Sequence, residues 1–205
     1  MPSRNIYKDY VAESYYHIYN RGLNRQRVYK NDKDYEVFLG LLKRYLGDDQ
    51  DKKPNRLTYP NYYKNIELLA FCLMPNHYHL FIFQHQPNAM TKLMKSLGVA
   101  YTMYFNKKYK RTGPAFQQRY KAIHITEDDQ LLHITRYLHL NPNNHTNYEW
   151  SSLPYYLGTK QASWLRPKRA LELFKKGEYK IFLEDYKDKR DELKQLKRQL
   201  DLADN

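Results

Sequence analysis

The chain has 205 residues, of which 41% are hydrophobic and 16% aromatic, which is enough for one domain with a real core plus an appendage. Its single cysteine, Cys72, excludes an internal disulfide, and the absence of a long apolar run predicts a cytoplasmic protein with no membrane segment. The formal net charge of +13 favours a polyanionic partner.

The first half of the chain alternates strand and helix patterns. Residues 14–21 (SYYHIYNR) predict a strand that ends at Gly22. Residues 32–46 show a helical period, and Gly47 stands where a helix C-cap is expected. The polar segment 47–64 contains two prolines and predicts a loop, and residues 65–74 and 77–84 then predict two strands joined as a hairpin by Pro75-Asn76.

The second half continues the alternation. Residues 88–108 predict a helix, 115–125 (AFQQRYKAIHI) a fourth strand, and 127–140 a helix with Thr126 as N-cap and Asp129 at N3. Asn141-Pro142 ends that helix. This order predicts an α+β domain with helices packed on a mostly antiparallel sheet over residues 1–157. Residues 158–205, helical over 171–202 and rich in charges of both signs, predict a C-terminal extension.

The string His77-Tyr78-His79 is the strongest candidate for a chemical site. Side chains two residues apart on a strand point from the same face, so the two imidazoles, about 7 Å apart along the strand, could hold one metal ion. A third ligand must then come from elsewhere in the fold. Two half-buried, hydrogen-bonded histidines are the alternative, and the donor set by itself suits several metals, including zinc.

The charge pattern around these histidines indicates the partner. Residues 68–126 contain no Asp or Glu but carry eight Lys and Arg residues. A basic run is often only a solvated face, but complete exclusion of acids favours attraction of a polyanion. The 22 tyrosines offer stacking surfaces for unpaired bases, although most of them fit ordinary packing.

Tyr137 and Asn141 lie four residues apart at the end of the helix expected over 127–140 and could project together. The phenol of Tyr137 could act as a nucleophile, and the amide oxygen of Asn141 could bind a metal. A core tyrosine and a helix-terminal asparagine explain the same pair. Among 22 tyrosines, spacing alone does not single one out.

Four strings in this order, HIYNRG, PNHYHLFI, FQQRYKA and RYLHLNP, resemble the single-tyrosine HUH transposases, and specifically the REP-associated tyrosine transposase group. The similarity extends from about Tyr15 to about Leu157, and Tyr78 fits the usually hydrophobic middle position loosely. The resemblance implies a ferredoxin-like sheet, His77 and His79 as ligands of Mg²⁺ or Mn²⁺, Tyr137 as the nucleophile and Asn141 as the third ligand. It also implies a bacterial, nucleoid-associated protein, with a monomer favoured over a homodimer and no small-molecule cofactor.

The chemistry implied by the resemblance is cleavage and rejoining of single-stranded DNA at repetitive palindromic hairpins, through a covalent 5′-phosphotyrosine. Positions expected to contact the DNA lie near the first and fourth strands: Asn20, Arg21, Arg25, Arg27, Arg119 and Lys121. Plain surface charge is the competing explanation for each of them.

Two other classes of protein compete with this interpretation. Histidine-triad nucleotide hydrolases also carry His-x-His on a strand, but they need a third histidine two positions on, where Phe81 stands. The other alternative is a catalytically idle protein that binds hairpin DNA through the same basic face, since each proposed catalytic residue also has a packing explanation.

Overall fold

The computed structural model describes residues 10–48 and 59–185, so parts of the expected loop 47–64 and of the expected helix 171–202 lie outside the described residues. In chain order the elements are β1 (Ser14–Arg21), η1 (Leu23–Arg25), α1 (Asp32–Leu46), β2 (Ile66–Met74), β3 (His77–Gln84), α2 (Ala89–Tyr109), β4 (Lys121–Ile125), α3 (Asp128–His139), η3 (His145–Asn147), α4 (Leu153–Tyr156), α5 (Lys168–Leu171) and α6 (Glu178–Glu184). The bounds predicted for β1, α1 and β3 are confirmed.

The four strands form one antiparallel sheet in the order β2-β3-β1-β4. With α1 between β1 and β2 and α2 between β3 and β4, this is the ferredoxin-like arrangement, so the expected α+β class is confirmed. The sheet separates two cores, because successive side chains of each strand point to opposite faces. None of the described helices is long and apolar enough to cross a membrane.

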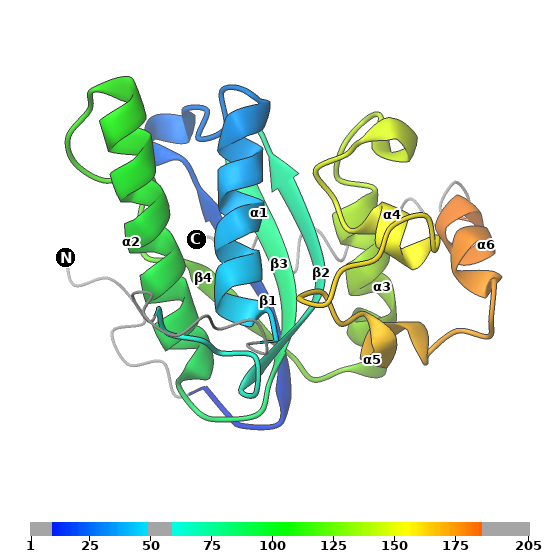
Figure 1. Ribbon diagram of the computed structural model, residues 1–205. Coiled ribbons are helices and arrows are strands. Elements are labelled where there is room, and N and C mark those ends of the chain that lie inside the picture. Colours follow the sequence, from blue (N-terminus) through cyan, green and yellow to red (C-terminus); the bar gives the residue numbers. More distant parts are fainter. Residues whose placement is uncertain (1–9, 49–58, 186–205) are drawn as a thin grey trace.

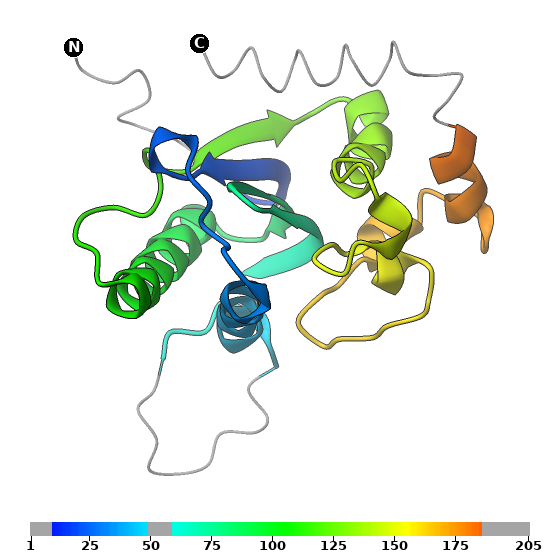
Figure 2. The same ribbon diagram turned by 90° about the horizontal axis from the view of Figure 1, so that it is seen from above.

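Helices α1 and α2 cover one face of the sheet, and α3 to α6 gather on the other (Figures 1 and 2). On β3, Tyr78 and Leu80 join the core under α1 and α2, whereas Phe81 and Phe83 join the core under α3. Two buried side chains of α3 hold it in place through polar contacts. His139 Nδ1 lies 2.5 Å from the Tyr179 hydroxyl of α6, and Arg136 donates to the carbonyl of Phe182.

Two predictions of element bounds were wrong near α3. The expected strand 115–125 begins only at Lys121, because the backbone before it pairs with the turn after β1: Leu23 N donates to Ala115 O, and Gln117 N donates to Arg21 O. Helix α3 begins at Asp128 with Glu127, not Thr126, as its N-cap. Leu131 N reaches the carbonyl of Glu127, which sets that start.

The C-terminal region also differs from the continuous helix expected from residue 171. Its described part contains the short α5 and α6, separated by a turn in which Gly177 has φ of +85°. A residue in the left-handed conformation interrupts a right-handed helix, and glycine adopts this conformation without steric cost. Both helices pack on the α3 side of the sheet, so this segment contributes to the second core: Ala170, Tyr179 and Leu183 are buried there.

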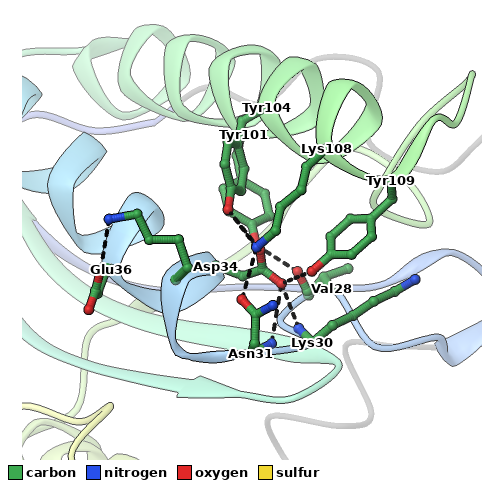
Figure 3. Close-up of polar contacts among 10 residues, drawn as sticks. Val28, Lys30, Asn31, Asp34, Glu36, Tyr101, Tyr104, Lys108 and Tyr109 are labelled. Atoms are coloured by element: carbon green, nitrogen blue, oxygen red, sulfur yellow. Dashed lines mark hydrogen bonds and ion pairs between the residues drawn. The ribbon is translucent and has the colours of Figure 1, made fainter.

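A buried carboxylate joins α1 to the end of α2 (Figure 3). Asp34 is fully buried and forms a 2.6 Å ion pair with Lys108, and it accepts hydrogen bonds from the Tyr104 and Tyr109 hydroxyls at 2.8 and 2.7 Å. It also accepts the backbone N–H of Lys30 at 2.8 Å. Burial alone would raise the pKa of Asp34, but these donors hold that pKa below its usual value.

We expect Asp34→Asn to lower the free energy of unfolding by about 3 kcal/mol, because it removes the buried negative charge that pairs with Lys108 and turns one of the two acceptor oxygens into an NH₂ group that faces other donors. The charged carboxylate stabilises the fold above its unfolded-state pKa of about 3.9, and this stabilisation is lost as pH falls through the lower folded-state pKa. Wild-type stability should therefore drop below about pH 4 more steeply than that of the variant. Urea unfolding at several pH values measures both effects.

The matched control is Glu36→Gln, which breaks the exposed 3.0 Å ion pair with Lys33 on the same helix. An exposed pair of this kind contributes roughly 0.5 kcal/mol or less. Equal losses in the two variants would contradict the structural role assigned to Asp34.

Candidate active site

Pairing of β3 with β1 places both histidines of the His-x-His string beside the end of β1. His77 lies opposite Arg21 and His79 opposite Tyr19 in the antiparallel register. The two imidazole rings are perpendicular, with centroids 5.0 Å apart. Because Phe81 and Phe83 continue the same face into the core under α3, the predicted common face of the two histidines is confirmed.

Tyr137 comes from α3, the helix that packs over this face. Its ring stands perpendicular to that of His79 with centroids 5.5 Å apart, and perpendicular to that of His17 at 5.9 Å. Only 8% of its surface is exposed. The fold therefore brings Tyr137 against His79 and His17, and His79 in turn contacts His77.

Asn141 lies just beyond the end of α3 and is half-buried. Its backbone N–H donates to Leu138 O at 3.4 Å, which continues the last turn of the helix. The residue thus follows Tyr137 closely in space, and its role as a metal ligand stays a prediction.

Sequence reasoning missed His17, which belongs to the same site. This residue of β1 is buried, and its Nε2 lies 2.9 Å from Nδ1 of His79, with the two rings stacked at a centroid distance of 5.1 Å. Burial lowers the pKa of His17 to about 3, so the ring is neutral at physiological pH. The available signal was its place in the HIYNRG string, two residues before Tyr19 on the same face of a strand.

The neighbours of the two imidazoles determine which nitrogen could bind a metal. His77 Nδ1 lies 2.6 Å from Asn76 Oδ1, and an amide oxygen can only accept, so His77 carries its proton on Nδ1 and its lone pair on Nε2. If His79 Nδ1–H donates to His17 Nε2, His79 also carries its proton on Nδ1 and its lone pair on Nε2. Both Nε2 atoms could then bind one ion, and outer contacts of this kind are typical of metal-binding histidines.

The two imidazole nitrogens could hold a divalent ion only together with further oxygen ligands. Within residues 10–48 and 59–185, no group of three His, Cys, Asp or Glu side chains could hold a metal. The two imidazoles would therefore be completed by neutral or ligand oxygens, such as the amide of Asn141 or a phosphate of DNA. Oxygen-rich coordination suits Mg²⁺ and Mn²⁺.

We expect His17→Phe to lower Mn²⁺ affinity about 10- to 100-fold, because the phenyl ring fills a similar space but cannot accept the hydrogen bond from His79 Nδ1–H. Titration calorimetry with Mn²⁺ measures the change. The control is His124→Phe, which removes an exposed imidazole from β4. Unchanged affinity in the His17 variant would mean that the hydrogen bond to His79 is not needed for metal binding.

The positions expected to contact DNA gather at the end of the sheet where His77 lies. Residues 21–27, here called the basic turn, carry Arg21, Arg25 and Arg27, the last two exposed. Lys121 of β4 pairs with Tyr19 of β1, two residues before Arg21, and burial and then the positive charge of Arg21 lower the pKa of Lys121. Such crowding of like charges suits the binding of phosphates.

Three positions in the basic region have surroundings that the sequence alone did not indicate. Asn20 Nδ2 donates to Gln118 O at 3.0 Å and its Oδ1 accepts the Arg21 N–H at 2.9 Å, and its contact with DNA stays a prediction. Arg119 is exposed but lies before β4 and not on it. Lys108, one of the eight cations in the acid-free stretch, is bound to Asp34.

A ferredoxin-like sheet with two histidines on a central strand, under a helix that carries a tyrosine, is the arrangement expected of a single-tyrosine transposase. Residues 55–141 match the family model described as transposase IS200 like, a range that includes His77, His79, Tyr137 and Asn141. This match confirms the resemblance to these transposases that the four strings indicated. No curated protein matches the chain.

Solved structures with a related fold include that of a REP-associated tyrosine transposase bound to a REP hairpin. It has 14% sequence identity and a TM-score of 0.53, and the alignment covers 81% of this chain and 92% of that one. A candidate transposase from Deinococcus radiodurans R1 has 17% identity and a TM-score of 0.38 over 63% of this chain and 89% of that one. The first of these shows that the fold is shared.

Proposed function

We propose that this protein cleaves and rejoins single-stranded DNA at repetitive palindromic hairpins, using Tyr137 as the nucleophile. The observation that carries the proposal is the contact of Tyr137 with His79, at a ring centroid distance of 5.5 Å, together with the contact of His79 with His77 at 5.0 Å. The IS200-like family match and the hairpin bound by the structural relative support it.

In the proposed reaction the Tyr137 hydroxyl oxygen forms a bond to a backbone phosphorus, and the bond from that phosphorus to the 3′-oxygen breaks. The products are a 5′-phosphotyrosine and a free 3′-hydroxyl, which takes up the proton that the phenol releases. A Mg²⁺ or Mn²⁺ ion bound at the site would polarise a phosphoryl oxygen. The covalent bond retains the energy of the phosphodiester, so rejoining needs no ATP.

Other residues of this chain would bind the ion, orient its ligands and contact the DNA. His77 and His79 would hold the ion through Nε2, with Asn141 as a third ligand, and His17 would orient His79 through the 2.9 Å hydrogen bond. Side chains at the same end of the sheet would contact the DNA: Asn20, Arg21, Arg25, Arg27, Arg119 and Lys121. Asn20 would also hold Arg21 in place, since its Oδ1 accepts the Arg21 N–H. Phosphate contacts of this kind fix position without reading sequence.

A catalytically idle hairpin-binding protein is the second candidate, and the low exposure of Tyr137, 8%, favours it, because a nucleophile must reach its phosphate. Incubation of the protein with labelled hairpins that carry single-stranded extensions, in the presence of Mn²⁺, separates the two functions. A labelled band that survives a denaturing gel supports the transposase. Hairpin binding with no such band, across the repetitive hairpins of the host, would favour the idle binder.

We also propose that the active unit is a monomer that acts in cis, because all three convergent side chains come from one chain. Light scattering on the protein, with and without hairpin DNA, measures the molecular mass. A dimer in both conditions would contradict the proposal.

A further inference from the structure

The basic turn is hydrogen-bonded to the connection between β2 and β3. Gly22 N donates to Asn76 O at 2.7 Å, and directly after the turn Val28 N and Tyr29 N both donate to Pro75 O, at 2.9 and 3.1 Å. The basic turn and the β2–β3 connection therefore form one hydrogen-bonded unit. The next residue after this connection is His77, the first candidate metal ligand.

The side chain of Asn76 extends this link from the basic turn to His77. Its Nδ2 donates to the backbone carbonyl of Arg25 at 3.3 Å, and its Oδ1 lies 2.6 Å from His77 Nδ1. The orientation of the amide is fixed by chemistry: a backbone carbonyl has only lone pairs, so it must face the NH₂ group. The amide oxygen then faces His77, which must donate from Nδ1.

The turn that presents the Arg25 carbonyl is held in an uncommon conformation. Asn24 and Arg25 have φ of +52° and +60°, the left-handed region that L residues rarely adopt. Its close packing requires a glycine at its start, because a Cβ on Gly22 would lie 2.2 Å from Gln26 O. A ligand that binds this conformation more tightly than the alternatives would stabilise it.

We propose that Asn76 is a positioning residue that couples the binding of a DNA phosphate on Arg25 to the binding of a metal ion by His77. The inference rests on the proposed function and adds a dependence between its two ligands. A phosphate held by Arg25 stabilises the left-handed turn, the turn keeps its carbonyl on the Asn76 amide, and the amide keeps His77 in the tautomer with its lone pair on Nε2. By linkage, each ligand raises the affinity for the other by the same factor.

The size of the effect follows from the single hydrogen bond that transmits it. Loss of one neutral hydrogen bond changes an equilibrium by about three- to tenfold, so removal of the Asn76 link should lower the coupling factor by that amount. Direct contact between the ion and the DNA also contributes to the coupling, but it contributes alike in all variants.

The experiment measures Mn²⁺ affinity with and without a generic hairpin that carries a single-stranded extension, at low salt, where phosphate contacts alone give binding. Asn76→Ala removes both contacts of the amide. Asn76→Asp keeps the acceptor for His77 but has no N–H for the Arg25 carbonyl. Both variants should have a coupling factor about three- to tenfold below that of the wild type.

A second pair of variants tests the other end of the link. Arg25→Ala and Arg27→Ala each remove one exposed cation from the basic turn, and both should weaken hairpin binding. Only Arg25→Ala should lower the coupling factor, because it removes the side chain proposed to hold the phosphate on the residue whose carbonyl Asn76 contacts. Equal coupling factors in these two variants, or in the wild type and both Asn76 variants, would overturn the inference.

Nitrogen NMR of His77 in the metal-free protein gives a measurement that does not depend on either ligand. The wild type and Asn76→Asp should show the Nδ1–H tautomer, and Asn76→Ala should show a mixture. A mixture in the wild type would overturn the inference. A wild-type protein that binds neither Mn²⁺ nor hairpin DNA would instead overturn the proposed function, and the coupling with it.

Discussion

Replacement of Tyr137 by phenylalanine is expected to abolish the covalent adduct with hairpin DNA, with a loss of at least about a thousandfold in the rate of strand cleavage. The phenol oxygen is the only atom removed, and it is the atom that forms the bond to phosphorus. The phenyl ring keeps its perpendicular packing on His79 and His17, so the free energy of unfolding should change by about 1 kcal/mol or less. A denaturing gel with labelled DNA measures the adduct.

Tyr155→Phe is the matched control, since Tyr155 is a half-buried tyrosine of α4 that packs on Phe71 and Trp164. This variant should form the adduct at the wild-type rate. An adduct that persists in Tyr137→Phe would show that another tyrosine is the nucleophile, and peptide mapping of the labelled protein would identify it.

His77→Ala is expected to remove Mn²⁺ binding and cleavage while leaving hairpin binding largely intact. The variant deletes one of the two imidazoles proposed as metal ligands, so the loss in metal affinity should exceed the roughly 100-fold that accompanies loss of an outer contact. His77 is half-buried at the start of β3, so the packing lost is small. Calorimetry with Mn²⁺, and a gel-shift assay in the absence of metal, separate the two activities.

His124→Ala serves as the control for this variant, because it deletes an exposed imidazole of the neighbouring β4. It should bind Mn²⁺ and cleave DNA as the wild type does. Loss of hairpin binding together with metal binding in His77→Ala would indicate that His77 supports the fold of this end of the sheet and is not primarily a ligand.

Most of the fold could be predicted from local patterns, and the failures have a common cause. Strand β1 and helix α1 were confirmed at both ends because alternation, helical period and the glycine after α1 all agree there. The segment before Lys121 also alternates in sequence, but its backbone partners are Arg21 and Leu23, which come from a turn about ninety residues away. Such partners cannot be identified from a strand pattern alone.

The site shows the same division between local and distant information. His77 and His79 were predictable because the period of a strand fixes their common face. Tyr137 could not be selected among 22 tyrosines without the family resemblance. The role of His17 depends on the register between β1 and β3, which sets His17 beside His79 across 62 residues of sequence.

The residues proposed for the chemistry are divided between two layers of the molecule. The histidines belong to the hydrogen-bonded sheet. The tyrosine belongs to α3, which packs on one face of the sheet and is held there in part by polar contacts of the buried His139 and Arg136. Detachment of that outer layer would separate the nucleophile from the metal ligands while the sheet stayed folded. Strand cleavage could therefore be disabled by a local opening that costs less than global unfolding, and hydrogen exchange would detect it as weaker protection in α3 than in β3.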